Sequence, residues 1–182
     1  SWATASDSVQ KVVDICENGD TIMIGNGIYT ELIRSERNAF SLTLIGTDAD
    51  SCVFDLSVYP PVGLNCKSLF VKHSITLENL NFKTTHLTND HIALFLGFSP
   101  VLETLNLRNC RFTNHDEGII ALITSGEVAG NYFYNVGRAV LNTDRPSAEY
   151  LKIYNNTIMR SKGTAIVCLY GTIRNNWIIM SQ

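Results

Sequence analysis

The stretch "YNNTIMRSKGTAIVCLYGTIRNNWIIM", from Tyr154 to Met180, contains the same short pattern twice. Near each end, two asparagines and one further residue are followed by an isoleucine, and Gly-x-Ala-Ile lies between the two pairs. Written as apolar-x-Asn-Asn-x-apolar, the copies are "IYNNTI" from Ile153 and "IRNNWI" from Ile173. Such a pair is either two ligand-binding loops or the same turn of a repeating coil in two successive rungs.

The pattern extends upstream, which favours the coil. Units of the form apolar-x-Asn/Gly-x-x-apolar begin, at intervals of 20 to 30 residues, at Leu77, Leu107, Val128, Ile153 and Ile173. A weaker pair, Ile24 and Leu44, precedes them, and glycine-led apolar segments start between the units at Gly118, Gly137 and Gly163. A period of this length built from short strands is typical of a β-solenoid. Each period therefore predicts a glycine-led strand, a second strand, an Asn turn and a third short strand.

The asparagines have a physical role in such a coil. Asn tolerates the left-handed backbone of a sharp turn, and stacked amide side chains can hydrogen-bond from one rung to the next. We expect this ladder to contain Asn79, Asn109, Asn155 and Asn175, with Gly130 in the middle rung. The apolar ends of the units predict an internal stack of Phe82, Phe112, Phe133, Ile158 and Ile178.

Composition is consistent with one folded domain over residues 1–182. Hydrophobic residues make up 45% of the chain and charged residues 17%, and the formal net charge is −3. These values give no reason to expect nucleic acid as a partner, and no apolar run is long enough to insert into a membrane. The five cysteines lack metal-site spacing, so we expect buried thiols, although a Cys52–Cys66 disulfide stays open.

The N-terminus predicts a capping helix over about residues 6–18. Ser6, Asp7 and Ser8 are suitable N-caps, an apolar stripe follows from Val9 to Cys16, and Asn18-Gly19 is a helix stop. The helix leads into Gly19-Asp20-Thr21-Ile22, a short strand and Gly27-x-Tyr29. This opening resembles the N-terminal cap of the right-handed parallel β-helix, or pectin-lyase-like, superfamily. The "SWAT" start is most similar to large bacterial cell-surface, adhesin-like β-helix proteins.

The resemblance implies an all-β, right-handed parallel β-helix of about seven rungs, with coils over about residues 20–182 and an extracellular or cell-surface location. Polysaccharide lyases on this fold use a Lys or Arg base with carboxylates that hold Ca²⁺. Two loops carry such residues: His115, Asp116 and Glu117 in one, and Asp144 and Arg145 in the other. Neither spacing is diagnostic of catalysis, and solvated turn residues are the interpretation we favour.

A second group of residues suits glycan binding. Arg138, Arg160 and Lys162 are cations that could meet carboxylate or sulfate groups, while Tyr134 and Tyr154 offer flat rings for sugars. For each of them an ordinary surface role is the alternative. No metal site is expected in this group.

The glycine-led strands are apolar on both alternating faces, for example "IIALI" from Ile119 and "AIVCLY" from Ala165. Continuous apolar strands indicate that both faces are covered. We therefore expect another domain or chain to cover this sheet and also the C-terminal end, where no polar capping segment follows the last repeat. Candidates for the outer face are Phe95, Val140, Val167 and Leu169.

Together these observations predict a non-catalytic module, a segment of a longer protein, that is a rigid scaffold and binding platform for glycans or proteins. The alternative is a lyase that acts on an acidic polysaccharide. No cofactor is expected in the first case, and Ca²⁺ only in the second.

Overall fold

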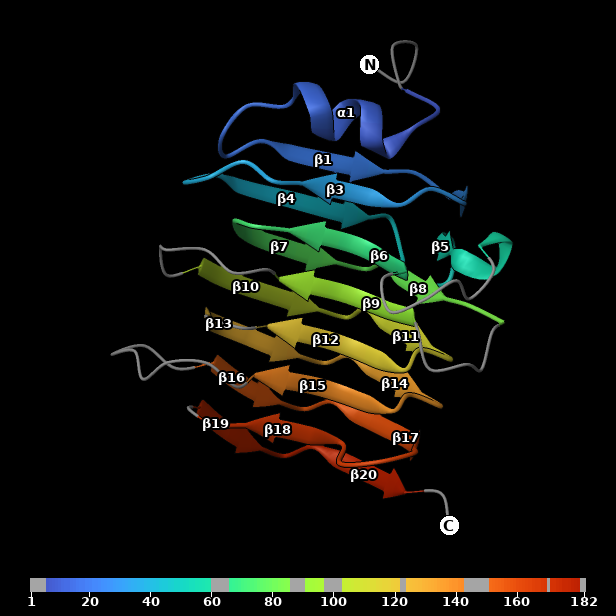
Figure 1. Ribbon diagram of the computed structural model, residues 1–182, viewed down its shortest axis with the longest axis vertical. Helices are drawn as coiled ribbons and strands as arrows, with labels where there is room; N and C mark the ends of the chain where they lie inside the picture. The colour runs from blue at the N-terminus through green and yellow to red at the C-terminus, as the bar shows by residue number, and fades with distance from the viewer. Residues whose placement is uncertain are drawn as a thin grey trace.

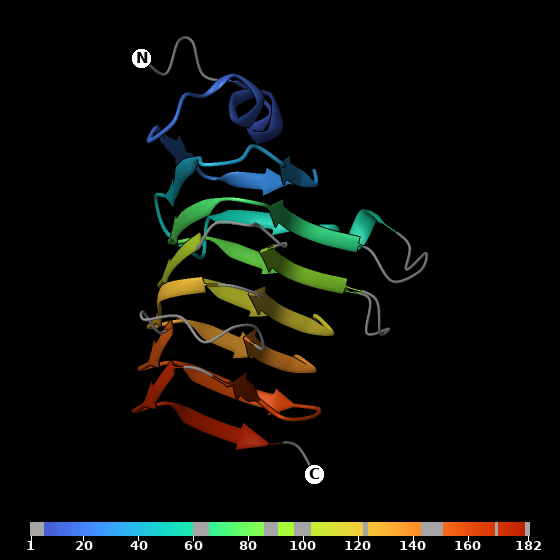
Figure 2. The ribbon, with the colours of Figure 1, turned by 60° about the vertical axis from the view of Figure 1, so that its left-hand side comes forward.

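The computed structural model describes residues 6–59, 66–85, 91–96, 103–121, 124–142, 151–169 and 171–180. Short parallel strands wind into a three-sided coil, with one short helix, α1 (Val9–Ile15), across its N-terminal end (Figures 1 and 2). A one-turn 3₁₀ helix, η2 (Leu56–Val58), lies in a connection. The all-β parallel β-helix with an N-terminal helix is thereby confirmed.

Three parallel sheets form the sides of the coil. Sheet A contains β1 (Thr21–Ile24), β4 (Ser41–Gly46), β7 (Ser74–Glu78), β10 (Glu103–Arg108), β13 (Thr124–Ala129), β16 (Leu151–Tyr154) and β19 (Gly171–Arg174). Sheet B contains β2 (Gly27–Tyr29), β5 (Cys52–Asp55), β8 (Asn81–Lys83), β11 (Arg111–Thr113), β14 (Tyr132–Tyr134), β17 (Thr157–Ser161) and β20 (Trp177–Met180). Sheet C contains β3 (Ile33–Ser35), β6 (Cys66–Val71), β9 (His91–Leu96), β12 (Glu117–Ala121), β15 (Arg138–Asn142) and β18 (Ile166–Cys168).

The predicted repeat matches the register of these sheets. The first residues of the five units are direct partners on neighbouring strands, from Leu77 and Leu107 through Val128 and Ile153 to Ile173. The weaker pair at the N-terminus was wrong by two residues, because Leu44 pairs with Ile22 and not with Ile24. Each coil thus adds one strand to each sheet, and seven-stranded sheets A and B agree with about seven rungs.

Like side chains stack along the coil axis and fill its interior. Phe54, Phe82, Phe112 and Phe133 form a continuous ring stack with centroids 5.2, 5.4 and 4.8 Å apart, each at most 1% exposed. Ile158 continues this column and is fully buried. The core of the coil is narrow, and burial of these close-packed aromatic and aliphatic columns is its main source of stability.

The Asn turns between sheets A and B have the backbone that the sequence predicted. Asn79, Asn109, Asn155 and Asn175 have φ between 52° and 55°, and Gly130 has φ 67°. A second left-handed position holds Asn114 and Asn135 between sheets B and C, and Arg160 at the corresponding bulge within β17. Asn and Gly are the residues that tolerate this conformation at least cost.

The amide ladder, however, lies one residue further along than predicted. The Oδ1 atom of Asn156 accepts hydrogen bonds from the backbone N and the Nδ2 of Asn131 at 2.9 and 3.0 Å. Asn176 accepts the same two bonds from Asn156 at 3.0 and 2.9 Å. Asn155 is exposed instead. The first asparagine of each pair makes the turn, and the second points inward and makes the ladder.

Helix α1 is held by two charged side chains from the first coil. At its N-terminus, Glu31 accepts hydrogen bonds from Val9 N at 2.6 Å and Gln10 N at 3.1 Å. At its C-terminus, the Arg37 guanidinium donates to the carbonyl oxygens of Val13 and Cys16. An anion at the N-terminus and a cation at the C-terminus both match the helix dipole. The helix is shorter than the predicted residues 6–18.

Among the cysteines whose side chains are described, Cys16, Cys52 and Cys110 are free thiols. The Sγ of Cys52 lies 3.3 Å from the carbonyl oxygen of Ile24, so this thiol is not part of the Cys52–Cys66 disulfide that the sequence left open. Burial raises the pKa of the Cys110 thiol to about 12. Buried thiols of this kind are structural and unreactive.

Candidate functional site

The outer face of sheet C carries the most distinctive surface side chains. Strand register aligns two outward columns. The first is Lys67, Ile92, Glu117 and Arg138. The second is Arg34, Phe70, Phe95, Ile120, Leu141 and Val167. We call these two columns together the sheet C face.

Two consecutive residues of each long strand point inward between the columns. In β9 these are Ala93 and Leu94, and in β15 they are Ala139 and Val140, all 0% exposed. Val140 was therefore wrongly placed on the outer face. Phe95 and Val167 lie in the outward column and are half-buried, and Leu169 is 63% exposed. The continuous apolar runs thus come partly from these inward pairs, which interrupt the period of two expected for a strand.

At the N-terminal part of the face, cations pack on two stacked rings. Phe70 and Phe95 have centroids 5.7 Å apart. The Lys67 Nζ lies 4.0 Å from the Phe95 centroid, and the Arg34 Cζ lies 5.6 Å from that of Phe70. A small cavity of about 220 Å³ opens among Arg34, Lys67, Phe70 and Leu32. Cations over ring faces are favourable contacts, and they keep the charged atoms at the surface.

Arg34 and Lys67 have no carboxylate within ion-pair distance among the described residues, although the charge of Glu36 interacts with that of Arg34. Lys72 pairs with Glu36 at 2.8 Å, but neither Arg34 nor Lys67 forms an ion pair with any residue that the structure describes. Partial burial, and then the nearby Arg34 charge, lower the pKa of Lys67. Burial and the second positive charge both disfavour the charged form of Lys67. A bound anion would offset this cost by its attraction to both cations.

At the C-terminal part of the face, the structure brings predicted catalytic and ligand-binding residues together. Asp116, Glu117, Arg138 and Lys162 line one shallow groove of about 410 Å³ with Gly137, Gly163 and Thr164. Arg138 binds the Glu117 carboxylate with two nitrogens, Nη2 at 2.6 Å and Nε at 2.9 Å from Oε1. Burial raises the pKa of Glu117 in spite of that guanidinium. Both oxygens of the Glu117 carboxylate thus accept hydrogen bonds from Arg138.

The other predicted catalytic residues are not in this groove. His115 is 0% exposed and lies in the interior, where burial and then the neighbouring His91 lower its pKa to about 3. Its imidazole has no access to a ligand on the surface. Asp144 and Arg145 lie outside the described residues.

The remaining ligand-binding candidates are distributed over the other two faces. Tyr134 and Arg160 lie together on sheet B, with the guanidinium carbon 5.3 Å from the ring centroid. Tyr154 lies on sheet A, where its hydroxyl donates to Glu127 at 2.6 Å and Arg174 covers its ring. The sequence therefore named residues from three separate surfaces.

Arg34, Lys67 and Phe70 were missed. The usable signal was the spacing Lys-x-x-Phe in β6, which recurs as Ile-x-x-Phe in β9 with Phe70 and Phe95 in register. Finding it needed the register of sheet C.

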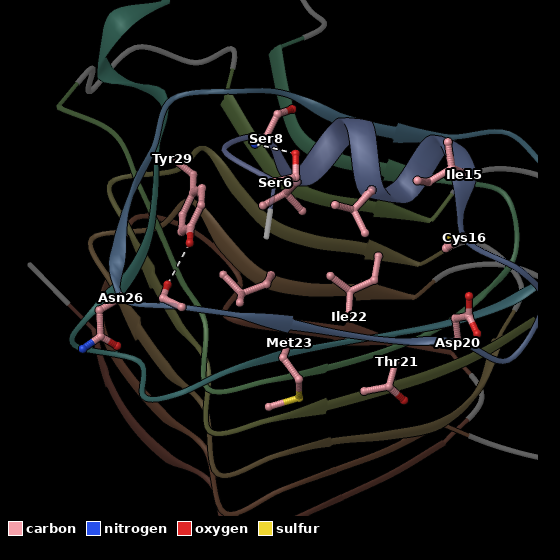
Figure 3. Close-up of a pocket in the computed structure, with 14 residues that line it drawn as sticks. Ser6, Ser8, Ile15, Cys16, Asp20, Thr21, Ile22, Met23, Asn26 and Tyr29 are labelled. Atoms are coloured by element: carbon pink, nitrogen blue, oxygen red, sulfur yellow. Dashed lines mark hydrogen bonds between the residues drawn. The ribbon is translucent and has the colours of Figure 1, made fainter. Parts of the chain in front are cut away.

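A larger pocket, of about 770 Å³, lies between α1 and the free edge of β1 (Figure 3). Ile22 points toward the helix, whereas Thr21 and Met23 point away from it. The hydroxyl of Tyr29 donates to the carbonyl oxygen of Gly25 at 2.8 Å. None of the predicted site residues lines this pocket, which is the seam between cap and coil.

Among the described residues, no group of three or more His, Cys, Asp or Glu side chains is arranged to hold a metal ion. None of the described helices has the length and apolar character needed to cross a membrane. Comparisons with protein-family models, curated proteins and solved structures find no match for this chain.

Proposed function

We propose that this chain is a non-catalytic, pectin-lyase-like β-helix module, displayed at the cell surface or outside the cell, and that its sheet C face binds an acidic glycan. The observation that carries the proposal is the pair of cations, Arg34 and Lys67, packed on the Phe70–Phe95 stack without a close ion pair to any described carboxylate.

The chemistry of that cluster suits a charged sugar. A flat apolar surface accommodates the face of a sugar ring, and guanidinium and ammonium groups bind carboxylate or sulfate oxygens. Neighbouring strands are spaced about 4.8 Å apart, so a ligand that lies along the coil axis meets a new rung at each step. The stacked strands hold these contacts rigidly, which lowers the entropic cost of binding.

Lyase activity is the second candidate, and the Glu117–Arg138 groove favours it. Asp116 and Lys162 also line this groove, so acidic and basic groups converge there. A Ca²⁺-dependent lyase needs several free oxygen ligands beside a base. Because Arg138 already occupies both oxygens of Glu117, binding without catalysis is the better-supported function.

Calorimetric titration with acidic polysaccharides and a neutral one tests the binding function. Lys67→Met keeps the apolar stem on the rings but removes the charge, and we expect about a tenfold loss of affinity, or about 1.4 kcal/mol. Lys152→Met, an exposed lysine on sheet A, is the matched control and should leave affinity unchanged. Equal binding of neutral and acidic polymers, or an unaffected Lys67→Met variant, would refute the proposal.

The lyase alternative is tested with the same polymers and Ca²⁺. A lyase releases an unsaturated sugar product that absorbs in the ultraviolet. We expect no rise in absorbance from the purified chain. A rise that a chelator abolishes and that Glu117→Gln removes would replace the binding function by the lyase.

A further inference from the structure

A continuous apolar column runs along the outer face of sheet C. Phe95, Ile120 and Leu141 are direct partners on β9, β12 and β15, and Val167 continues the column on β18. All four side chains are half-buried, and no described helix or strand lies over sheet C (Figure 1). One apolar side chain at an outward position is ordinary, but contiguous apolar surface marks an interaction site.

The fold does not require an apolar column at this place. The matching outward column of sheet A, on the same four coils, is polar: Thr76, Asn106, Glu127 and Lys152. The first three of these side chains are half-buried, as Phe95 is. A strand with one solvated face normally alternates apolar and polar residues. Sheet A follows this rule on the coils where sheet C departs from it.

The charges beside the column are distributed unevenly. At its N-terminal end, the Lys67 Nζ lies 4.0 Å from the Phe95 centroid, and Arg34 lines the same small cavity as Lys67. Two coils further along, Glu117 and Arg138 neutralise each other in an ion pair of 2.6 Å. The column is therefore cationic at one end, and the charges beside its middle cancel.

We propose that the acidic glycan bound by this face is the head of a glycolipid, and that its acyl chain lies along the column. This inference rests on the proposed glycan function and adds the aliphatic part of the ligand. The anionic sugar binds at Arg34 and Lys67, and the chain extends from Phe95 toward Val167. Neighbouring strands are about 4.8 Å apart, so this part of the column is about 14 Å long and suits an extended hydrocarbon chain.

The width of the column favours a single chain over a protein partner. The column is one residue wide, because the outward column beside it holds the charged Glu117 and Arg138. A stable protein–protein interface buries about 800 Å² on each partner and has a broader apolar centre. An aliphatic chain needs only a line of apolar contacts, and the cations at one end fix its direction.

Calorimetric titration of the parent chain with alkyl glucuronides tests the inference. Octyl, decyl and dodecyl glucuronide, each below its micelle concentration, share one acidic sugar and differ only in chain length. Full burial of a methylene raises affinity about fourfold and half burial about twofold, so dodecyl glucuronide should bind about sixteenfold more tightly than octyl glucuronide. Equal affinities would overturn the inference, whereas the proposed function would stand if acidic polysaccharides still bind.

Alkyl glucosides of the same lengths, which lack the carboxylate, separate the glycolipid from the glycan function. We expect each glucoside to bind about tenfold more weakly than the matching glucuronide, because it cannot pair with the two cations. Equal binding of both series, with the same dependence on chain length, would refute the acidic glycan function and with it the glycolipid. Binding of acidic polysaccharides without binding of any alkyl glucuronide would refute the glycolipid alone.

Two substitutions made together locate the chain on the column. Ile120→Thr with Leu141→Thr removes apolar surface but keeps residues that suit a strand. The dodecyl-to-octyl affinity ratio should fall to about fourfold. Ile45→Thr, at a half-buried outward position of sheet A, is the matched control and should leave the ratio unchanged. An unchanged ratio in the double variant would contradict the inference, and the titrations of the parent chain decide it if that variant does not fold.

A second copy of the chain is the competing occupant of the column. Sedimentation equilibrium of the parent chain without ligand should show a monomer. A dimer that the double variant dissociates would mean that a second copy covers the column, and the glycolipid would then be ruled out.

Discussion

The two ends of this coil differ in how far they bury the same inward column of side chains. At the N-terminal end, Ile22 lies beneath α1 and is 9% exposed, whereas at the other end Ile173 is 48% exposed. Both belong to the inward column of sheet A. A solenoid has a core that runs its full length, so whatever covers its ends is part of its stability.

The cap owes little to the intrinsic stability of its helix. Seven residues are too few for a helix to persist alone in water. Instead, Glu31 and Arg37 extend from the first coil to the two ends of α1, and Val9 and Val13 are buried against the coil. Closure is therefore a property of the first coil, and the last coil has no equivalent among the described residues.

Matched truncations at the two ends test this difference most directly. Ile22→Ala removes a buried side chain and should lower the free energy of unfolding by about 3 kcal/mol. Ile173→Ala removes a half-exposed one and should cost about 1 kcal/mol. Urea denaturation measures both values. Equal losses would mean that α1 does not close the core.

Acid should destabilise the folded coil through its buried His115. His115 has an ordinary pKa of 6.5 when unfolded and a pKa of about 3 when folded. Between about pH 6.5 and pH 3, His115 is therefore protonated in the unfolded chain and neutral in the folded chain. The stability is fully present above pH 6.5, and falls by about 1.4 kcal/mol per pH unit down to about pH 3. At pH 5 the loss is about 2 kcal/mol.

Urea denaturation at a series of pH values measures this slope. His115→Leu removes the titrating group, so its free energy of unfolding should depend less steeply on pH than that of the parent chain. The hydrogen bond from Tyr154 also lowers the pKa of Glu127 in the folded chain, so some slope remains. An unchanged slope in His115→Leu would assign the acid sensitivity to another group.

Sequence periodicity was sufficient for the interior of the coil and insufficient for its surface. Phe112 and Phe133 recur because every rung must fill the same space, and this recurrence is visible in one chain. The shift of the ladder from Asn155 to Asn156 was not visible, because two adjacent asparagines fit the spacing equally well. Only the backbone decides which of them turns and which points inward.

The candidate site was less predictable for a related reason. Surface residues obey no packing repeat, so their proximity depends on register across connections of variable length. Glu117 and Arg138, which the sequence analysis assigned to two different groups, come together because β12 and β15 are neighbours in sheet C. Arg34 and Phe70 belong to neighbouring strands of sheet C separated by a long stretch of sequence, and no pattern joined them.

The stabilisation of α1 by Arg37 should depend on the shape of the guanidinium group as well as on its charge. Arg37→Lys keeps the charge but loses the planar fork that reaches two carbonyl oxygens and covers Phe40. We expect a loss of about 1.5 kcal/mol in the free energy of unfolding, close to that of one or two hydrogen bonds. Arg34→Lys, an exposed arginine nearby, should change it by less than about 0.5 kcal/mol. A similar effect of both changes would remove the special role of Arg37.

The smallest predicted effect is a gain in stability near the open end. Arg160 has φ 57° at the position where the two preceding rungs have Asn114 and Asn135. A left-handed backbone costs an ordinary residue about 1 kcal/mol, and asparagine less. Arg160→Asn gives up the contact with Tyr134, worth about 0.5 kcal/mol, so a net gain of about 0.5 kcal/mol is expected in thermal or urea unfolding. Arg174→Asn is the control, because Arg174 stacks on Tyr154 in the same way without a left-handed backbone, and it should lose stability. If both variants lose stability, ring contacts and not backbone strain dominate in the last coils.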